Sequence, residues 1–278
     1  MSKILGMLNT LNIEKTLPYL DGYIFGLKDF SINFLHTYTL DELEETFTKL
    51  KENNKEIYIC INKNLHNSEI KKLKELLKKI DDMNINGIFY ADNGFITLKD
   101  ELKLKTELIW YQEHLTTSYT SINTYYKFGI NGTVISNDIT FNEAKEIIDN
   151  TKSKLYYMMF GYLPMFVSER NQIKNYERYF NLKGSTEYNY FINDNKKYPI
   201  IDNEMSTMAF SHNPICAYQE YLEIKNKIYA VILSDLFIDE DTYLKIVQKF
   251  KEENDLDINS LIETSTHFLY QDTIYKIK

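Results

Sequence analysis

The chain contains, at residues 155–171, the stretch LYYMMFGYLPMFVSERN. Its first five residues are apolar or aromatic, which predicts a buried β-strand. Gly161 then allows the backbone to leave the strand at dihedral angles that other residues avoid. Because scaffolds usually display binding and catalytic groups on the loops at strand ends, Tyr162, Ser168 and Arg170 are candidate ligand-binding residues.

Arginine is rare in this sequence, since only Arg170 and Arg178 occur among 32 lysines and arginines. A guanidinium offers a planar fork that binds a carboxylate through two parallel hydrogen bonds, whereas an ammonium is a point charge. One interpretation is therefore that Arg170 binds a small carboxylate. The other is that Arg170 ties its loop to the protein, through Glu169 or a neighbouring carboxylate.

Outside this stretch, short apolar runs alternate with amphipathic helices, which is typical of parallel βαβ units. Two of the predicted helices begin with capping boxes, at Thr39 with Glu42 and at Thr140 with Glu143. We predict an α/β fold, a (β/α)8 TIM-barrel-like domain. Its strands are expected at residues 4–8, 22–26, 56–61, 87–91, 106–110, 132–136, 154–159 and 228–233. A doubly wound open sheet is disfavoured, because no Gly-x-Gly-x-x-Gly follows the first strand.

The alternation changes after the seventh strand. Residues 188–192 and 198–201 flank a polar turn, which predicts a β-hairpin inserted at about 186–202. Another short strand is expected at 205–210. We therefore assign residues 1–255 to one barrel domain with this insertion, and 256–278 to a C-terminal tail that packs on the barrel.

Composition excludes several classes of protein. The net charge of −8 argues against broad nucleic-acid binding, which depends on lysine and arginine neutralising phosphates. Cys60 and Cys216 are too few for an iron–sulfur cluster, and no metal site is expected. No apolar run reaches the ~18 residues that cross a membrane, and the first 14 residues are too polar for a signal peptide. These features predict a cytoplasmic protein.

The carboxyl ends of barrel strands are where such folds place their chemistry. After the fifth strand the chain reads Gln112-Glu113-His114, and a carboxylate beside an imidazole can do acid–base work. Glu113 and His114 are therefore the candidate catalytic residues, expected at one barrel mouth with the three ligand-binding candidates. Alternatively, Thr116 or Thr117 caps the next helix and Glu113 pairs with a neighbour.

The opening stretch resembles the signature of peptidase family U32, the collagenase-like proteases. In that family a strand runs into His-Gly, and Tyr-Ser-Gly-Arg-Cys follows. Gly161, Ser168 and Arg170 match the motif, whereas Phe160 stands in place of the His and Asn171 in place of the Cys. The run at 129–136, the helix start at 140–143 and the tail at 268–276 are also similar, so the resemblance spans most of residues 105–275.

The resemblance implies a barrel-like fold and several competing functions. Some members are called peptidases, and others serve in hydroxylation of the tRNA wobble uridine or of quinones. Many members hold a four-cysteine iron–sulfur cluster, which this chain cannot ligate alone. Autonomous proteolysis is disfavoured by the sequence itself, since there is no His-Glu-x-x-His pair and Ser168 lacks the Gly-x-Ser-x-Gly elbow.

Two hypotheses follow for the function. In the first, which we favour, the chain is a subunit or accessory factor in tRNA uridine hydroxylation. It binds a small carboxylate through Arg170 and works with a larger U32-family partner, through which the tRNA is reached and the cluster supplied. In the second, it is a U32-type peptidase or a degenerate, non-catalytic binding module of that family.

Overall fold

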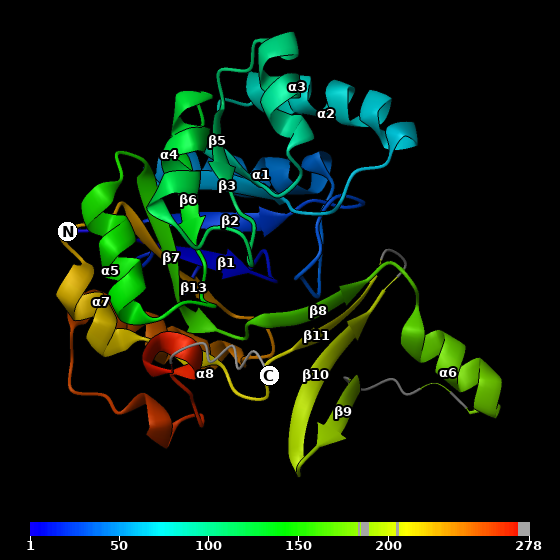
Figure 1. Ribbon diagram of the computed structural model, residues 1–278, viewed down its shortest axis with the longest axis vertical. Helices are drawn as coiled ribbons and strands as arrows, with labels where there is room; N and C mark the ends of the chain where they lie inside the picture. Colours follow the sequence, from blue (N-terminus) through cyan, green and yellow to red (C-terminus); the bar gives the residue numbers. More distant parts are fainter. Residues whose placement is uncertain (183, 185–188, 204–205, 272–278) are drawn as a thin grey trace, which may run out of the picture.

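The computed structural model describes residues 1–182, 184, 189–203 and 206–271. Eight parallel strands close into a barrel, in which β7 pairs with both β6 and β13 (Figure 1). The barrel strands are β1 (Lys3–Leu8), β2 (Gly22–Gly26), β3 (Glu56–Ile61), β4 (Gly87–Tyr90), β5 (Glu107–Trp110), β6 (Gly132–Ile135), β7 (Lys154–Gly161) and β13 (Ala230–Ser234). The predicted (β/α)8 architecture is confirmed, and the open doubly wound sheet is excluded.

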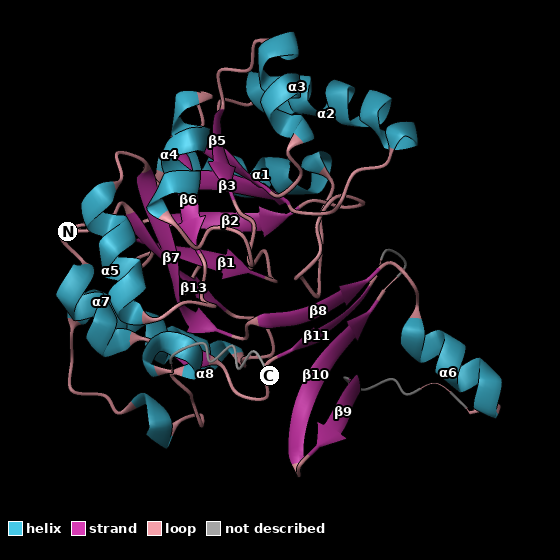
Figure 2. Ribbon diagram, in the orientation of Figure 1, coloured by secondary structure: helices cyan, strands magenta, loops and turns pink. Residues whose placement is uncertain are grey.

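Helices cover the outside of the barrel (Figure 2). They are α1 (Leu40–Glu52), α2 (Ile70–Asp82), α3 (Gly94–Leu102), α4 (Tyr119–Lys127), α5 (Phe141–Asn150), α7 (Tyr218–Ile224) and α8 (Glu240–Glu252). Both predicted capping boxes are formed, at the starts of α1 and α5. Each helix turns a buried apolar stripe toward the strands, as Leu43, Phe47 and Leu50 do in α1.

The barrel interior is filled by aromatic rings. Tyr58 of β3, Phe89 of β4 and Tyr156 of β7 meet across it, with ring centroids 5.2 to 6.2 Å apart and steep interplanar angles. Edge-to-face pairs of this kind pack densely and favourably. The barrel is therefore a packed core, and chemistry is confined to its mouth.

The region after β7 is larger than the predicted hairpin. Strands β9 (Asn189–Asn193) and β10 (Lys196–Asp202) form that hairpin, and β8 (Pro164–Ser168) and β11 (Thr207–Phe210) extend it to an antiparallel sheet of order β8-β11-β10-β9. Helix α6 (Gln172–Phe180) lies beside the sheet, which projects from the barrel (Figure 1). The first residues of the predicted hairpin, 186–188, and the start of the predicted strand at 205 lie outside the described residues.

Two further segments bear on the predictions made from the sequence. Residues 256–271 of the C-terminal tail contact the barrel, since Ile258 and Leu269 are buried in the main core. Between β11 and β13 the chain forms β12 (Ile215–Cys216), which pairs with the end of β7, and then α7, which begins at Tyr218. None of the helices in the described ranges has the length and apolar character that a membrane span needs.

Candidate functional site

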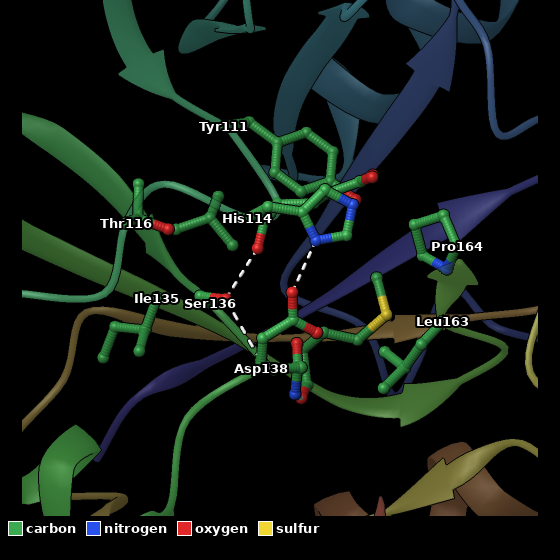
Figure 3. A pocket seen from close by; sticks show the side chains of 12 residues that line it. Tyr111, His114, Thr116, Ile135, Ser136, Asp138, Leu163 and Pro164 are labelled. Carbon is green, nitrogen blue, oxygen red and sulfur yellow. Dashed lines mark hydrogen bonds and ion pairs between the residues drawn. The ribbon is translucent and has the colours of Figure 1, made fainter. Parts of the chain in front are cut away.

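A pocket opens at the carboxyl ends of β5, β6 and β7 (Figure 3). One wall is formed by Glu113 and His114, which follow β5. Residues 136–138, after β6, form the floor, and the apolar pair Leu163 and Pro164 closes the side toward β8. The pocket thus joins a carboxyl group and an imidazole to an apolar wall at the position where barrel folds carry their chemistry.

Glu113 is the centre of this pocket. Its carboxylate is half-buried and accepts hydrogen bonds from the Asn33 side-chain amide and from the side chain of Tyr111. Burial raises the pKa of Glu113 to about 7, although these two hydrogen bonds and the nearby His114 act in the opposite direction. A carboxyl group with a pKa near neutrality can both donate and accept a proton at physiological pH.

His114 is oriented by a neighbouring carboxylate. Its Nδ1 lies 2.5 Å from Oδ2 of Asp138, and the backbone N–H of Asp138 donates to Oγ of Ser136 at 3.1 Å. The same Ser136 hydroxyl donates to the backbone oxygen of Glu113 at 2.6 Å, so the β5 and β6 loops are linked (Figure 3). His114 and Asp138 are both exposed, so their pairing orients the imidazole and contributes little to stability.

The helix-capping alternative is resolved by the structure. Ser118 caps α4, because its side chain accepts from the backbone N–H of Ser121, and the helix begins at Tyr119. Thr116 instead donates to the backbone oxygen of Gln112 at 3.2 Å. The prediction that Thr116 or Thr117 caps this helix is therefore wrong. Glu113 does pair with a neighbour, the amide of Asn33, but this contact does not remove it from the pocket wall.

Tyr162, Ser168 and Arg170 do not line this pocket. Tyr162 packs edge-on against Phe237, with ring centroids 5.5 Å apart, in a small second core under the insertion. Ser168 belongs to β8, and its Oγ accepts from the backbone N–H of Arg170 at 3.2 Å. The Arg170 side chain is exposed beyond β8 and makes no hydrogen bond or ion pair with the described residues. The structure thus brings Glu113 and His114 together, and ligand binding by the other three stays a prediction.

Two polar residues near the mouth were missed as site residues. Asn33 is buried in the loop between β2 and α1, where its φ of +68° suits asparagine, and its backbone N–H lies 3.2 Å from Sδ of Met208 in β11. Asp138 lies in the loop after β6. In a chain so rich in asparagine, no local signal separates Asn33 from an ordinary turn residue. Asp138 could have been found, because it follows a predicted strand end by two residues.

A second carboxyl group lies at the other side of the mouth. Asp235, directly after β13, accepts from the backbone N–H of Asn9 at 2.9 and 3.0 Å and from its side-chain amide at 2.7 Å. Burial raises the pKa of Asp235 to about 6, against these hydrogen bonds. Asn9 is fully engaged by this contact and by the N–H of Leu35, so the pair mainly joins β1 to β13.

The raised pKa of Glu113 predicts how stability changes with pH. The folded state favours the protonated acid, so this contribution is complete below pH 4.5, the ordinary value, and is lost as pH rises through about 7. We expect Glu113→Gln to remove about 2–4 kcal/mol of the stability difference between pH 5 and pH 8. Urea unfolding of the parent and the variant at both pH values measures this difference.

The control for this measurement is Glu146→Gln, which replaces an exposed carboxylate on α5 and should leave the pH dependence unchanged. Asp235 contributes with the same sign and a midpoint near pH 6, so part of the pH dependence survives in Glu113→Gln. An unchanged pH dependence in Glu113→Gln would show that this carboxyl group is not protonated near neutrality.

Comparison with known proteins places the chain in a family. The model of peptidase family U32 matches residues 19–276. The chain belongs to peptidase family U32. Within it, tRNA hydroxylation protein P2 of Bacillus subtilis is 21% identical over 211 residues, covering 73% of this chain and 68% of that protein. An uncharacterized protease of Methanocaldococcus jannaschii is 30% identical over 155 residues, covering 55% of this chain and 37% of that protein.

Solved structures agree with the fold of this U32 chain. The structure of a U32 peptidase superposes with a TM-score of 0.54 at 11% identity, covering 84% of this chain and 92% of that one. A protein from Aquifex aeolicus gives a TM-score of 0.51 at 8% identity, covering 90% of this chain and 92% of that one. At these identities the likeness concerns the fold alone.

The residues of this U32 chain do not fit a four-cysteine cluster. Cys60 is fully buried in β3 and Cys216 lies in β12, so the sequence offers two thiols where four thiolates are needed. Phe160, in place of the family His, is fully buried in the core. Among the described residues, no group of three or more His, Cys, Asp or Glu side chains is arranged to hold a metal ion. That the chain binds no cluster stays a prediction.

Proposed function

We propose that this U32 chain is a subunit in the hydroxylation of tRNA uridine. The observation that carries the proposal is the likeness to tRNA hydroxylation protein P2, which extends over 73% of the chain. A second relative, tRNA hydroxylation protein P1, is 21% identical over 158 residues, which are 57% of this chain and 36% of that protein. The pocket at the barrel mouth offers a carboxyl group and an imidazole as candidate acid–base groups.

Glu113 and His114 are the proton-handling groups in this proposal. Glu113 exchanges a proton near neutral pH, because burial raises its pKa to about 7. His114 is held at Nδ1 by Asp138, which leaves Nε2 to meet a ligand in the pocket. The apolar wall of Leu163 and Pro164 limits water beside the half-buried Glu113, and electrostatic interactions strengthen where water is excluded.

A larger U32-family protein is proposed as the partner. This chain supplies only two cysteines, so a cluster used in the reaction would be ligated by the partner. The chain's net charge of −8 also favours a partner as the part that contacts the tRNA backbone.

Peptidase activity is less well supported by the described residues. The thiol of Cys60 is fully buried, and burial raises its pKa well above the ordinary value, so it is not a ready nucleophile. The hydroxyl of Ser168 accepts a hydrogen bond from the backbone of its own loop, and among the described residues no histidine is hydrogen-bonded to it as a base.

The proposed carboxylate ligand of Arg170 gives a prediction. Because Arg170 is exposed and unpaired among the described residues, its guanidinium is available, and solvent limits its contribution to about 1–2 kcal/mol. We expect Arg170→Lys to weaken binding of small carboxylates about tenfold, measured by calorimetry with a panel of mono- and dicarboxylates.

The matched control is Arg178→Lys, which makes the same change at the other arginine, also exposed, on α6. We expect it to leave carboxylate binding unchanged. A lowered melting temperature of Arg170→Lys with unaltered binding would assign Arg170 to holding its loop in place instead.

The proposed function is tested in cells that lack this gene. Their tRNA is expected to lose the hydroxylated uridine, and expression of this chain should restore it, as measured by mass spectrometry of tRNA nucleosides. Purification of the tagged chain from the same cells should recover a larger U32-family protein. Unaltered uridine hydroxylation in the deletion strain would overturn the proposal.

A further inference from the structure

The sheet inserted after β7 carries most of the exposed apolar side chains of the described structure. Of 17 large hydrophobic residues that are exposed, ten lie between residues 165 and 192. They are Met165, Phe166, Val167, Tyr176, Tyr179, Phe180, Leu182, Tyr190, Phe191 and Ile192, and their exposed fractions run from 40% to 80%. We call these ten residues the insertion surface. Such a concentration marks an interaction site.

Within the part of the chain that the structure describes, no layer covers these side chains of the insertion. Consecutive residues of β8 and of β9 are exposed, so both faces of the sheet carry apolar groups open to water. Helix α6 buries none of its own residues. Between α6 and the sheet lies an apolar groove of about 620 Å³, lined by Phe166, Tyr176 and Phe191 among others. A sheet normally buries at least one face, and this one does so only where it meets the barrel.

The sheet also ends in an open edge. Among the described strands, β9 pairs only with β10, so its other edge has no strand beside it. The sequence of β9 is NYFIN, which contains neither a charge nor a proline. Natural edge strands usually carry such residues to prevent pairing with another chain. The open edge of β9 can therefore pair with a strand of another chain.

The size of the insertion surface fits a stable complex. An aromatic or large apolar side chain contributes about 150–250 Å² when fully buried. The seven residues of the insertion surface that lie outside β8 are roughly half exposed, so they offer on the order of 700 Å². A standard protein interface buries about 800 Å² on each partner. The insertion surface is thus close in size to one such interface.

Charge indicates which partner fits. Residues 164–210 contain six lysines and arginines and six aspartates and glutamates, whereas the whole chain has a net charge of −8. A balanced surface lacks the excess of positive charge that RNA binding requires. Two copies of this acidic chain can approach through this region without net charge repulsion, because its own positive and negative charges balance.

We infer that the insertion surface is a dimerisation interface that binds a second copy of this chain. Two identical β9 edges pair antiparallel about a twofold axis, and the exposed side chains of β9 and α6 pack against those of the other copy. A twofold interface uses the same patch on both subunits, so an uncharged, apolar strand is self-complementary. This inference is independent of the proposed role in tRNA hydroxylation.

Sedimentation of the full-length chain across a range of concentrations tests the inference. We expect a dimer with a dissociation constant in the micromolar range or tighter. Ile192→Lys, at a β9 position that is 64% exposed, should raise that constant on the order of a hundredfold, because the symmetry buries the new charge twice. Hydrogen exchange should show protection of β9 amides that grows with concentration.

The matched control is Phe128→Lys, which places the same charge at a 58% exposed apolar residue after α4, outside the insertion surface. It should dimerise as the parent does. Circular dichroism and melting of both variants establish that they are folded. A chain that stays monomeric at all concentrations, or a dimer that Ile192→Lys leaves intact, overturns the inference.

Discussion

Replacement of Glu113 by glutamine is expected to lower tRNA uridine hydroxylation by about 10²- to 10⁴-fold, the usual contribution of a general acid or base. Glutamine keeps the shape of the side chain and its hydrogen bond to Asn33, but it cannot take up or release a proton. The measurement is the fraction of hydroxylated uridine in tRNA from deletion cells that express the variant at the parent level.

The control for this loss is Glu146→Gln, which changes an exposed carboxylate remote from the pocket and should restore hydroxylation fully. A loss of hydroxylation would not be due to unfolding of the variant. Ionised Glu113 lowers the stability of the folded state, because its carboxylate is desolvated, and Glu113→Gln removes this unfavourable charge. Full hydroxylation by Glu113→Gln would contradict the acid–base role of this pocket while leaving the family membership untouched.

Gly161→Ala is expected to lower the free energy of unfolding by about 3–5 kcal/mol, a large share of the 5–15 kcal/mol typical of proteins. Gly161 ends β7 with a φ of +139°, a conformation nearly restricted to glycine. A Cβ there would also lie 2.8 Å from the Cβ of Ser234 in β13. Urea denaturation measures the change.

Gly129→Ala separates the two causes of this loss of stability, which are the unfavourable backbone φ and the steric clash of the added Cβ. Gly129 also has a positive φ, of +79°, but its nearest neighbour to an added Cβ is the flexible end of Lys99 at 3.4 Å. Gly129→Ala should lower the free energy of unfolding by only about 1–2 kcal/mol, because only the backbone conformation is unfavourable. Equal costs at the two glycines would show that β7 and β13 separate readily at this end of the barrel.

The barrel could be predicted from the sequence because its signals are local. Each strand is a short apolar run, and each helix has an apolar stripe with a capping residue before it, as Thr39 and Thr140 show. Parallel strands joined by helices leave few topologies, and eight such units close into a barrel. Local patterns therefore sufficed for this part of the fold.

The inserted region was predicted only in part, because its residues do not follow the rule that apolar side chains are buried. Three consecutive exposed residues, Met165 to Val167, hide the alternation of β8, and α6 has no buried face. The stretch 164–171 was therefore interpreted as a loop that displays site residues. It forms instead a strand and the turn that follows it.

The candidate site was predicted where one loop supplies neighbouring residues, as with Glu113 and His114. It was not predicted where residues come together from distant loops, as with Asn33 and Glu113, which are 80 positions apart. Sequence adjacency also suggested that Ser168 and Arg170 share the pocket. The antiparallel pairing of β8 with β11 separates them from it, and no pattern in β8 alone reveals that pairing.

The position of β1 has a consequence for how this protein is made. β1 is synthesised before the other seven barrel strands, yet one of its two neighbours is β13. Lys3 and Tyr229, which lie in contact, are 226 residues apart. At 5–20 residues per second, the ribosome needs on the order of 10–45 seconds to add that length. Throughout that interval the nascent chain exposes one edge of β1, and once β7 has been made it exposes one edge of β7 as well. Closure of the barrel therefore waits until β13 has been made, and chaperones that shield strand edges should associate with the growing chain.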